Sequence, residues 1–176
     1  ASLNQYLAMQ GCQDPVTYGE EVEFDIETYP NYFLIQFLFK GQFVVAFEKR
    51  NEQPFTQLTE LAFICQNFCL VGFNSNSYDI PMTRHFLSGQ ATNESLHRLS
   101  TDLVENELRW WDISDNYPHN AKIFINTYDL IEVAPDPNKI SLKMYSARRL
   151  GDKLQDLPYE PHQVLTDEEI KVVFDY

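Results

Sequence analysis

Three strand-like runs follow one another early in the chain, and this succession constrains the fold more than any other feature of the sequence. The runs span residues 21–27, 32–40 and 42–48, with Gly41 and Gln42 at the second turn. Turns this short join antiparallel strands, so the three runs predict a meander. Helical periodicity over residues 54–68 leads to a short apolar run at 70–74, which predicts a parallel strand reached through a crossover helix.

The second half of the chain is less regular. Helices are predicted at residues 80–87, 93–107 and 141–150, and strand character returns at 122–131. Residues 90–121 are interpreted as an insertion, in which the polar and aromatic stretch RWWDISDNYPHN (109–120) is predicted to be a loop. A capping box formed by Thr166 and Glu169 begins a final helix, whose apolar face would carry Ile170, Val173 and Phe174. The chain is predicted to form one domain, residues 1–176.

Composition limits the classes to which this chain can belong. The 176 residues carry a formal net charge of −13, which argues against a protein that coats duplex DNA, because affinity for phosphate backbones comes largely from Lys and Arg. No apolar run approaches the roughly 20 residues that span a bilayer, so no membrane association is expected. The odd number of cysteines suits a reducing compartment, and Cys65 and Cys69 are expected to pack in the core along one helical stripe.

Two carboxylates occupy the first strand-like run, in the sequence EFDIETY. Residues two apart in a strand face the same side, so Asp25 and Glu27 are expected side by side, with Ile26 facing away. Two such charges repel each other, and burial raises the cost further, unless a cation lies between them. The pair therefore indicates a metal site whose other ligands lie elsewhere in the chain.

Asp79 is the next candidate ligand, because it follows the parallel strand predicted at 70–74. Three antiparallel strands, a crossover helix and a parallel strand are the order of a ribonuclease H-like α/β fold, a mixed five-stranded sheet flanked by helices. In this layout the ends of the first and fourth strands are adjacent. Asp79 is therefore expected beside Asp25 and Glu27.

The stretches DIET (25–28) and NSNSYD (74–79) resemble the first two motifs of the DEDD 3′–5′ exonucleases, the proofreading domains of family-A and family-B DNA polymerases. Asn74, Tyr78 and Asp79 match the second motif of the family-B group, which is Asn, three residues, Phe or Tyr, then Asp. The resemblance continues through TYDL, LKMYSARRLG and LPYEP to the last residue. It is nearest to the exonuclease domains of phage-type polymerases.

The resemblance implies a role for each matching residue. The cofactors would be two Mg²⁺ or Mn²⁺ ions, which prefer hard carboxylate ligands and act together in phosphodiester hydrolysis. The metal ligands would be Asp25, Glu27 and Asp79, and the contacts to a single-stranded 3′ end would be Thr28, Asn74 and Tyr78.

The third motif of the tyrosine subclass is Tyr, three residues, then Asp on a late helix. Tyr176 matches the tyrosine and would orient the attacking water, which places the fourth carboxylate four positions on, beyond the given sequence. The resemblance thus implies a chain truncated at its C-terminus. His162 and Asp167 have the spacing of the histidine subclass and are a rival pair, although the Thr166 cap places His162 outside the final helix.

The function that this resemblance implies is a metal-dependent 3′–5′ exodeoxyribonuclease acting on single-stranded or frayed DNA 3′ ends, in proofreading during phage DNA replication. The partners would be the DNA 3′ end and a polymerase domain or another replication protein. The location would be the cytoplasm, that of the host if the gene is phage-encoded. Two alternatives stay open: a non-catalytic exonuclease-like binding module, and a histidine-subclass RNA exonuclease.

Several other residues have both a structural and a functional interpretation. Asp129 in TYDL is interpreted as a strand-end turn or supporting residue rather than a metal ligand. Tyr78 belongs to the core or contacts substrate, with neither preferred. Trp110 and Trp111 would stack on bases or, the preferred interpretation, pack within the insertion. A basic cluster, which would contact phosphate or form a solvated helix face, comprises Lys139, Lys143, Arg148 and Arg149.

Overall fold

A single five-stranded sheet organises the molecule, and its strand order is β3-β2-β1-β4-β5. The computed structural model describes residues 19–51, 53–117, 120–133 and 156–176. The strands are β1 (Glu21–Tyr29), β2 (Tyr32–Phe39), β3 (Phe43–Arg50), β4 (Cys69–Gly72) and β5 (Asn126–Asp129). The first three pair antiparallel, whereas β4 and β5 join parallel. The predicted α/β class with a mixed five-stranded sheet is confirmed.

The turn between β2 and β3 explains their tight pairing. Lys40 and Gly41 both have positive φ, 54° and 64°, and the Gln42 N–H donates to the Phe39 carbonyl at 3.1 Å. Two successive positive φ angles twist the turn in the same sense as the strands that it joins. The turn therefore begins one residue earlier than predicted from sequence.

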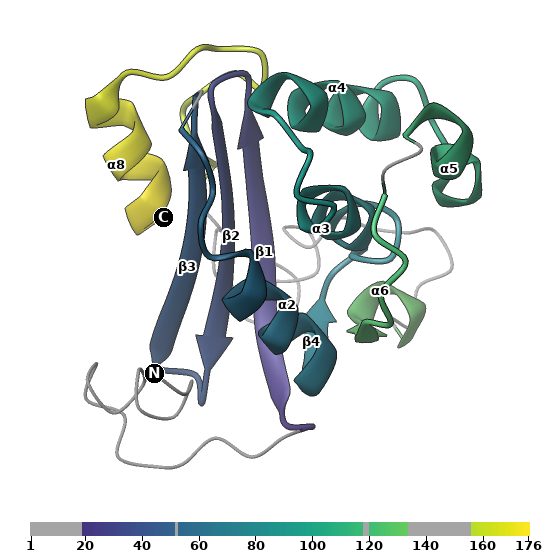
Figure 1. Ribbon diagram of the computed structural model, residues 1–176. Helices are drawn as coiled ribbons and strands as arrows, with labels where there is room; N and C mark the ends of the chain where they lie inside the picture. The colour runs from purple at the N-terminus through teal and green to yellow at the C-terminus, as the bar shows by residue number, and fades with distance from the viewer. Residues whose placement is uncertain (1–18, 52, 118–119, 134–155) are drawn as a thin grey trace.

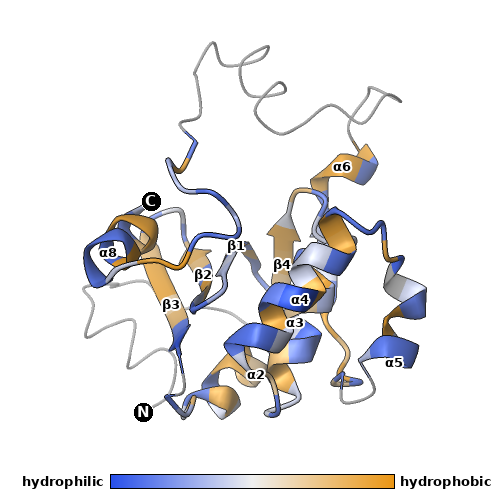
Figure 2. Ribbon diagram, turned by 90° about the horizontal axis from the view of Figure 1, so that it is seen from above, coloured by the Kyte–Doolittle hydropathy of each residue, from blue (hydrophilic) through white to orange (hydrophobic). Residues whose placement is uncertain are grey.

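Helices cover both faces of the sheet (Figures 1 and 2). One face is covered by α2 (Leu58–Asn67), α3 (Asp79–Leu87) and α4 (Asn93–Val104), and the other by α8 (Asp167–Asp175). Among the described residues no helix is long and apolar enough to cross a bilayer. The short helices are η1 (Trp110–Asp112), α5 (Ile113–Asn116) and α6 (Leu130–Val133).

Some sequence predictions need correction. A loop was expected where η1 and α5 form, and the strand expected at 122–131 is limited to β5 and turns into α6. Cys65 is buried on α2 as predicted, but Cys69 lies on β4 and is only half-buried, because the helix ends before it. Trp111 is 54% exposed, and the Arg109 guanidinium lies over its ring, 5.3 Å from the centroid, so it packs only in part within the 90–121 segment. The predicted helix at 141–150 and the basic cluster at 139–149 lie outside the described residues.

Two apolar clusters lie on opposite sides of the sheet. The larger contains residues of all three helices on its side, including Leu96 and Leu99 of α4, so the segment interpreted as an insertion contributes to the main core. The smaller cluster joins α8 to the first two strands, and its members are Tyr29, Tyr32, Leu34, Leu165, Ile170 and Val173. Phe174 is 38% exposed, in contrast to the prediction that it shares the apolar face of α8.

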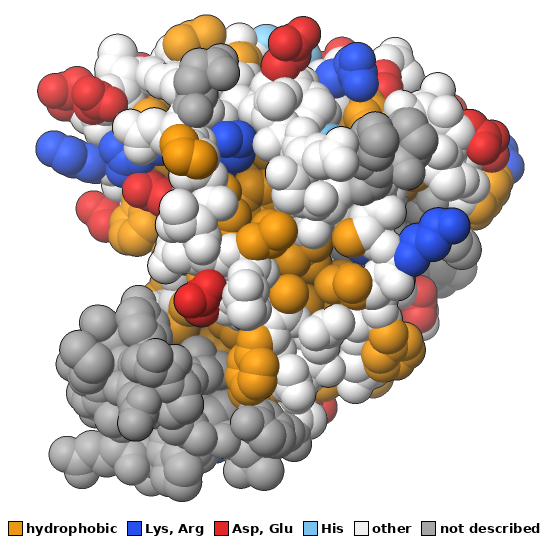
Figure 3. Space-filling model, in the orientation of Figure 1, with side chains coloured by type: hydrophobic (Ala, Val, Ile, Leu, Met, Phe, Trp, Pro, Cys, Tyr) orange, Lys and Arg blue, Asp and Glu red, His pale blue; other side chains and the backbone are white. Residues whose placement is uncertain are grey.

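Charged side chains are distributed unevenly over the surface. On the face that carries α2, apolar side chains gather toward the middle and charged ones lie mostly nearer the rim (Figure 3). The side chains of β1 also separate by type, here between the two faces of the strand. Val22, Phe24 and Ile26 are buried on one face, and the residues that alternate with them are acidic. The main core therefore forces the acidic residues of β1 onto the face that α8 covers.

We predict that Gly72→Ala lowers the free energy of unfolding by about 1–3 kcal/mol, the usual cost of overpacking a core. A Cβ at Gly72 would lie 2.7 Å from Ser75 Cβ and 3.0 Å from Phe24 Cε1, so β4 or the turn after it must move. Urea denaturation measures this change. As a control, Ser77→Ala alters an exposed side chain of the same turn and should stay within about 0.5 kcal/mol of the wild type. Equal stability of both variants would contradict the prediction.

Candidate active site

Asp25 and Glu27 lie on the same face of the central strand, as predicted. They pair in register with Gln36 and Leu34 of β2, whose side chains share that face. Asp25 keeps access to solvent, but the surrounding protein atoms displace water from its carboxyl, and this loss of hydration raises the pKa of the carboxyl above its usual value of 3.8. A hydrogen bond from the Ile26 backbone acts in the opposite direction but is the smaller effect.

Asp79 is the first residue of α3 and is buried. Its pKa is raised well above 3.8, first by burial and then by the negative charge of Asp25, with smaller contributions from Asp129 and Glu27. A hydrogen bond from its own backbone N–H partly offsets these effects. The structure therefore brings Asp25, Glu27 and Asp79 within electrostatic reach of one another, although they come from two elements far apart in sequence.

Tyr176 follows α8 and lies beside the β1 carboxylates. It lines a pocket of about 290 Å³ together with Asp25, Glu27, Gln36 and Val173. Partial burial, followed by the charges of Glu27 and Asp25, raises the pKa of the Tyr176 hydroxyl. Tyr176 thus remains protonated at neutral pH and can donate a hydrogen bond toward the carboxylates.

Specific hydrogen bonds hold α8 over this pocket. The Asn31 side chain donates to the Leu165 carbonyl at 2.8 Å and accepts from the Leu165 N–H at 2.9 Å. Gln36 Nε2 donates to the Phe174 carbonyl at 2.8 Å, two residues before Tyr176. Sequence reasoning missed both positioning residues. An Asn in a turn and a Gln in a strand have many ordinary roles, so the sequence contains no signal for these contacts.

Asp129 has a supporting role, as predicted. Its Oδ1 accepts from the backbone N–H of Asn74 at 2.7 Å and of Ile131 at 3.1 Å, and its Oδ2 accepts from the N–H of Asn76 at 2.9 Å. The end of β5 is thereby tied to the turn between β4 and α3. This turn places Asp79, so Asp129 acts on the site through the backbone.

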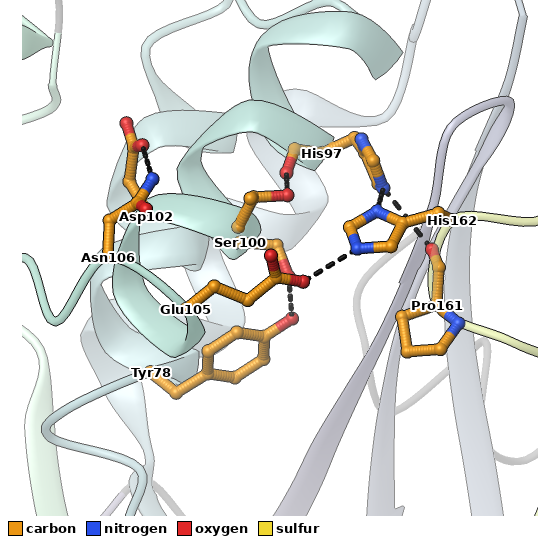
Figure 4. Close-up of polar contacts among 9 residues, drawn as sticks. Tyr78, His97, Ser100, Asp102, Glu105, Asn106, Pro161 and His162 are labelled. Atoms are coloured by element: carbon orange, nitrogen blue, oxygen red, sulfur yellow. Dashed lines mark hydrogen bonds and ion pairs between the residues drawn. The ribbon is translucent and has the colours of Figure 1, made fainter.

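The three expected substrate contacts have different environments. Asn74 is exposed, with a left-handed backbone (φ 59°) that Asn tolerates better than most residues. Tyr78 is half-buried, and its hydroxyl lies 2.8 Å from Ser100 Oγ of α4 (Figure 4). Thr28 is buried beside Tyr78: burial raises the pKa of the Tyr78 hydroxyl, and the nearby Ser100 and Thr28 hydroxyls partly offset this rise. Of the three, Asn74 offers the most accessible side chain.

The rival pair, His162 and Asp167, lies apart from these carboxylates. His162 forms contacts with Glu105 and His97 of α4. Asp167 begins α8 and acts electrostatically on Arg50 at the end of β3. His162 therefore faces α4 and Asp167 faces the end of β3, and neither of these contacts involves Asp25 or Asp79.

A metal ion would be held most readily by the hard oxygen ligands Asp25, Glu27 and Asp79, whose donor set suits Mg²⁺ or Mn²⁺. Their mutual effect on the Asp79 pKa shows that negative charge accumulates there. In the part of the chain that the structure describes, however, no three Asp, Glu, His or Cys side chains converge closely enough to hold an ion as they stand.

Comparison with known proteins gives no match to a family model, a curated protein or a solved structure. The residues of this chain and their arrangement are therefore the basis for its proposed function.

We predict that Asp79→Asn makes the protein more stable at neutral pH when a chelator is present. Because the folded-state pKa of Asp79 is raised, the folded protein binds more protons than the unfolded chain between pH 3.8 and that raised value. The free energy of unfolding should therefore fall as the pH rises through this window. Urea denaturation in EDTA at a series of pH values should show that Asp79→Asn removes much of this fall.

Asp115→Asn is the matched control, since it makes the same change of charge at an exposed position of α5. It should retain the pH dependence of the wild type. If Asp79→Asn also retains the pH dependence of the wild type, the pKa of the Asp79 carboxyl is not raised in the folded protein.

Proposed function

We propose that this chain is a 3′–5′ exonuclease domain with a ribonuclease H-like fold, which hydrolyses the terminal phosphodiester bond of single-stranded or frayed DNA. The observation that carries the proposal is the grouping of Asp25 and Glu27 on β1, Asp79 at the start of α3 and Tyr176 after α8. The strand order β3-β2-β1-β4-β5 supports the proposed fold, because it sets β1 between its antiparallel and its parallel neighbour.

The charge of the site determines how it would treat a nucleic acid. Carboxylates repel a phosphodiester, so the proposed substrate needs cations at Asp25, Glu27 and Asp79 to offset that repulsion. Asp25, Glu27 and Asp79 would hold divalent cations, which would supply Lewis-acid chemistry for phosphodiester hydrolysis. The protein residues supply position: β1 presents Asp25 and Glu27 together, and the turn held by Asp129 presents Asp79.

Tyr176 and Asn74 have complementary roles in this proposal. The Tyr176 hydroxyl, which keeps its proton, donates a hydrogen bond that orients the attacking water beside Glu27. Asn74, exposed on the turn before Asp79, contacts the last nucleotides of the strand. The proposed setting is proofreading during phage DNA replication, with a polymerase or another replication protein as partner, in the cytoplasm.

A non-catalytic binding module is the second candidate. It is favoured by one observation: the described acidic side chains do not form a complete three-ligand group as they stand. In this case the pocket beneath α8 would bind nucleic acid or protein without hydrolysis.

We predict that a chain that extends past Tyr176 and carries Asp four positions after it shortens 5′-labelled single-stranded DNA from its 3′ end in Mg²⁺ or Mn²⁺. That Asp is the carboxylate of the Tyr-x-x-x-Asp motif. Asp25→Ala in this background should lower the rate by at least about a hundredfold, as expected when a ligand of the cation that stabilises the transition state is lost. Gel analysis of the labelled products measures both rate and direction.

The matched control is the same chain with Asn in place of that Asp, which should bind the DNA but cleave it slowly. Hydrolysis that persists in EDTA, or that begins at the 5′ end, would contradict the proposal. DNA binding without any hydrolysis in Mn²⁺ would favour the non-catalytic module.

A further inference from the structure

His97 of α4 and His162 of the segment before α8 bring two ring nitrogens together at the surface (Figure 4). His97 Nε2 lies 3.2 Å from His162 Nδ1 and also 3.2 Å from the carbonyl oxygen of Pro161. The ring planes are nearly perpendicular, at 86°. His97 Nε2 thus lies within hydrogen-bond reach of two electron-pair donors, the His162 nitrogen and the Pro161 oxygen, and becomes a third when its own ring proton is on Nδ1.

The separation of the nitrogens is close to that of two ligands on one metal ion. With Zn–N distances of about 2.0–2.1 Å and tetrahedral angles, two imidazole nitrogens lie roughly 3.3–3.4 Å apart. The observed 3.2 Å is within about 0.2 Å of this value. Small side-chain movements are thus enough to place an ion between the two rings.

Glu105 gives the His162 ring a defined orientation. Its Oε1 lies 2.6 Å from His162 Nε2, so the carboxylate accepts the proton of that nitrogen. With the proton at Nε2, the neutral ring directs the lone pair of Nδ1 toward His97. A carboxylate behind the outer nitrogen of a histidine is the usual supporting arrangement of metal-bound imidazole.

We propose that His97 Nε2, His162 Nδ1 and the Pro161 carbonyl oxygen bind a divalent transition-metal ion of the class that imidazole prefers, such as Zn²⁺, with Glu105 as the supporting carboxylate. The side chains of His162 and Glu105 are 54% and 51% exposed, so the site is open and water completes the coordination. No third Asp, Glu, His or Cys side chain of the described chain joins the ligands.

This ion would connect α4 to the segment that leads into α8. Pro161 and His162 precede the Thr166 cap of α8 by only a few residues, whereas His97 is held within α4. The metal would thereby fasten the start of α8, whose far end carries Tyr176. The inference stands independently of the proposed exonuclease activity, because it uses none of the residues assigned to that activity.

Calorimetric titration of the whole chain with Zn²⁺, in excess Mg²⁺ to occupy hard oxygen ligands, tests the proposal. One Zn²⁺ should bind per chain and raise the melting temperature, since a ligand that binds only the folded state stabilises it. His97→Ala and His162→Ala should abolish this binding. Glu105→Gln should weaken it about 10–100-fold, as expected for loss of a supporting carboxylate.

Glu107→Gln is the matched control for Glu105→Gln, because it makes the same change at a nearby exposed position and should bind Zn²⁺ like the wild type. Far-UV circular dichroism of each metal-free variant shows whether it is folded. Zn²⁺ binding that survives in folded His97→Ala would overturn the proposal. Loss of Zn²⁺ binding in Asp25→Asn would also overturn it, because the ion would then lie at the β1 carboxylates. Thiolate charge-transfer bands in the Co²⁺ spectrum would overturn it too, because they place the ion at a cysteine. Absence of stoichiometric binding would overturn it as well.

Discussion

The separation of apolar and acidic side chains on β1 is the constraint on which the rest of the structure depends. Phe24 and Ile26 are committed to the main core, so Asp25 and Glu27 must face α8. β1 is also the strand at which the sheet changes from antiparallel to parallel pairing. The acids therefore lie where several elements converge, and neighbouring protein raises the energy of their charges.

A single buried carboxylate organises the other side of the site. Asp129 accepts three backbone N–H groups, two of them from the turn that leads to Asp79. A buried carboxylate is costly unless hydrogen bonds satisfy it, and this turn provides them. The left-handed conformation of Asn74 is maintained by the same contact. Asp129 thus makes the position of Asp79 depend on β5, because the Asn76 backbone that it holds lies 53 residues earlier in the chain.

The last helix, α8, is held over the site by apolar packing along its length and by side-chain hydrogen bonds at its two ends. Ile170 and Val173 supply apolar area against Tyr29, Tyr32 and Leu34, whereas Asn31 and Gln36 fix the backbone at the two ends of α8. Tyr176 reaches the β1 carboxylates only because both ends are held. The proposed metal at His97 and His162 would add a third attachment, a few residues before the Thr166 cap of α8.

The sequence by itself determined the strand meander, the α8 capping box and the shared face of Asp25 and Glu27, because local periodicity and capping chemistry depend on residues near one another in the chain. It also placed Asp79 after the fourth strand. Only the tertiary structure decided that Asp129 holds the Asn74 turn, that Gln36 meets Phe174, and that His162 faces His97 rather than Asp167. These contacts join residues from about 55 to 138 positions apart, and no local pattern encodes which distant backbone group a polar side chain will find.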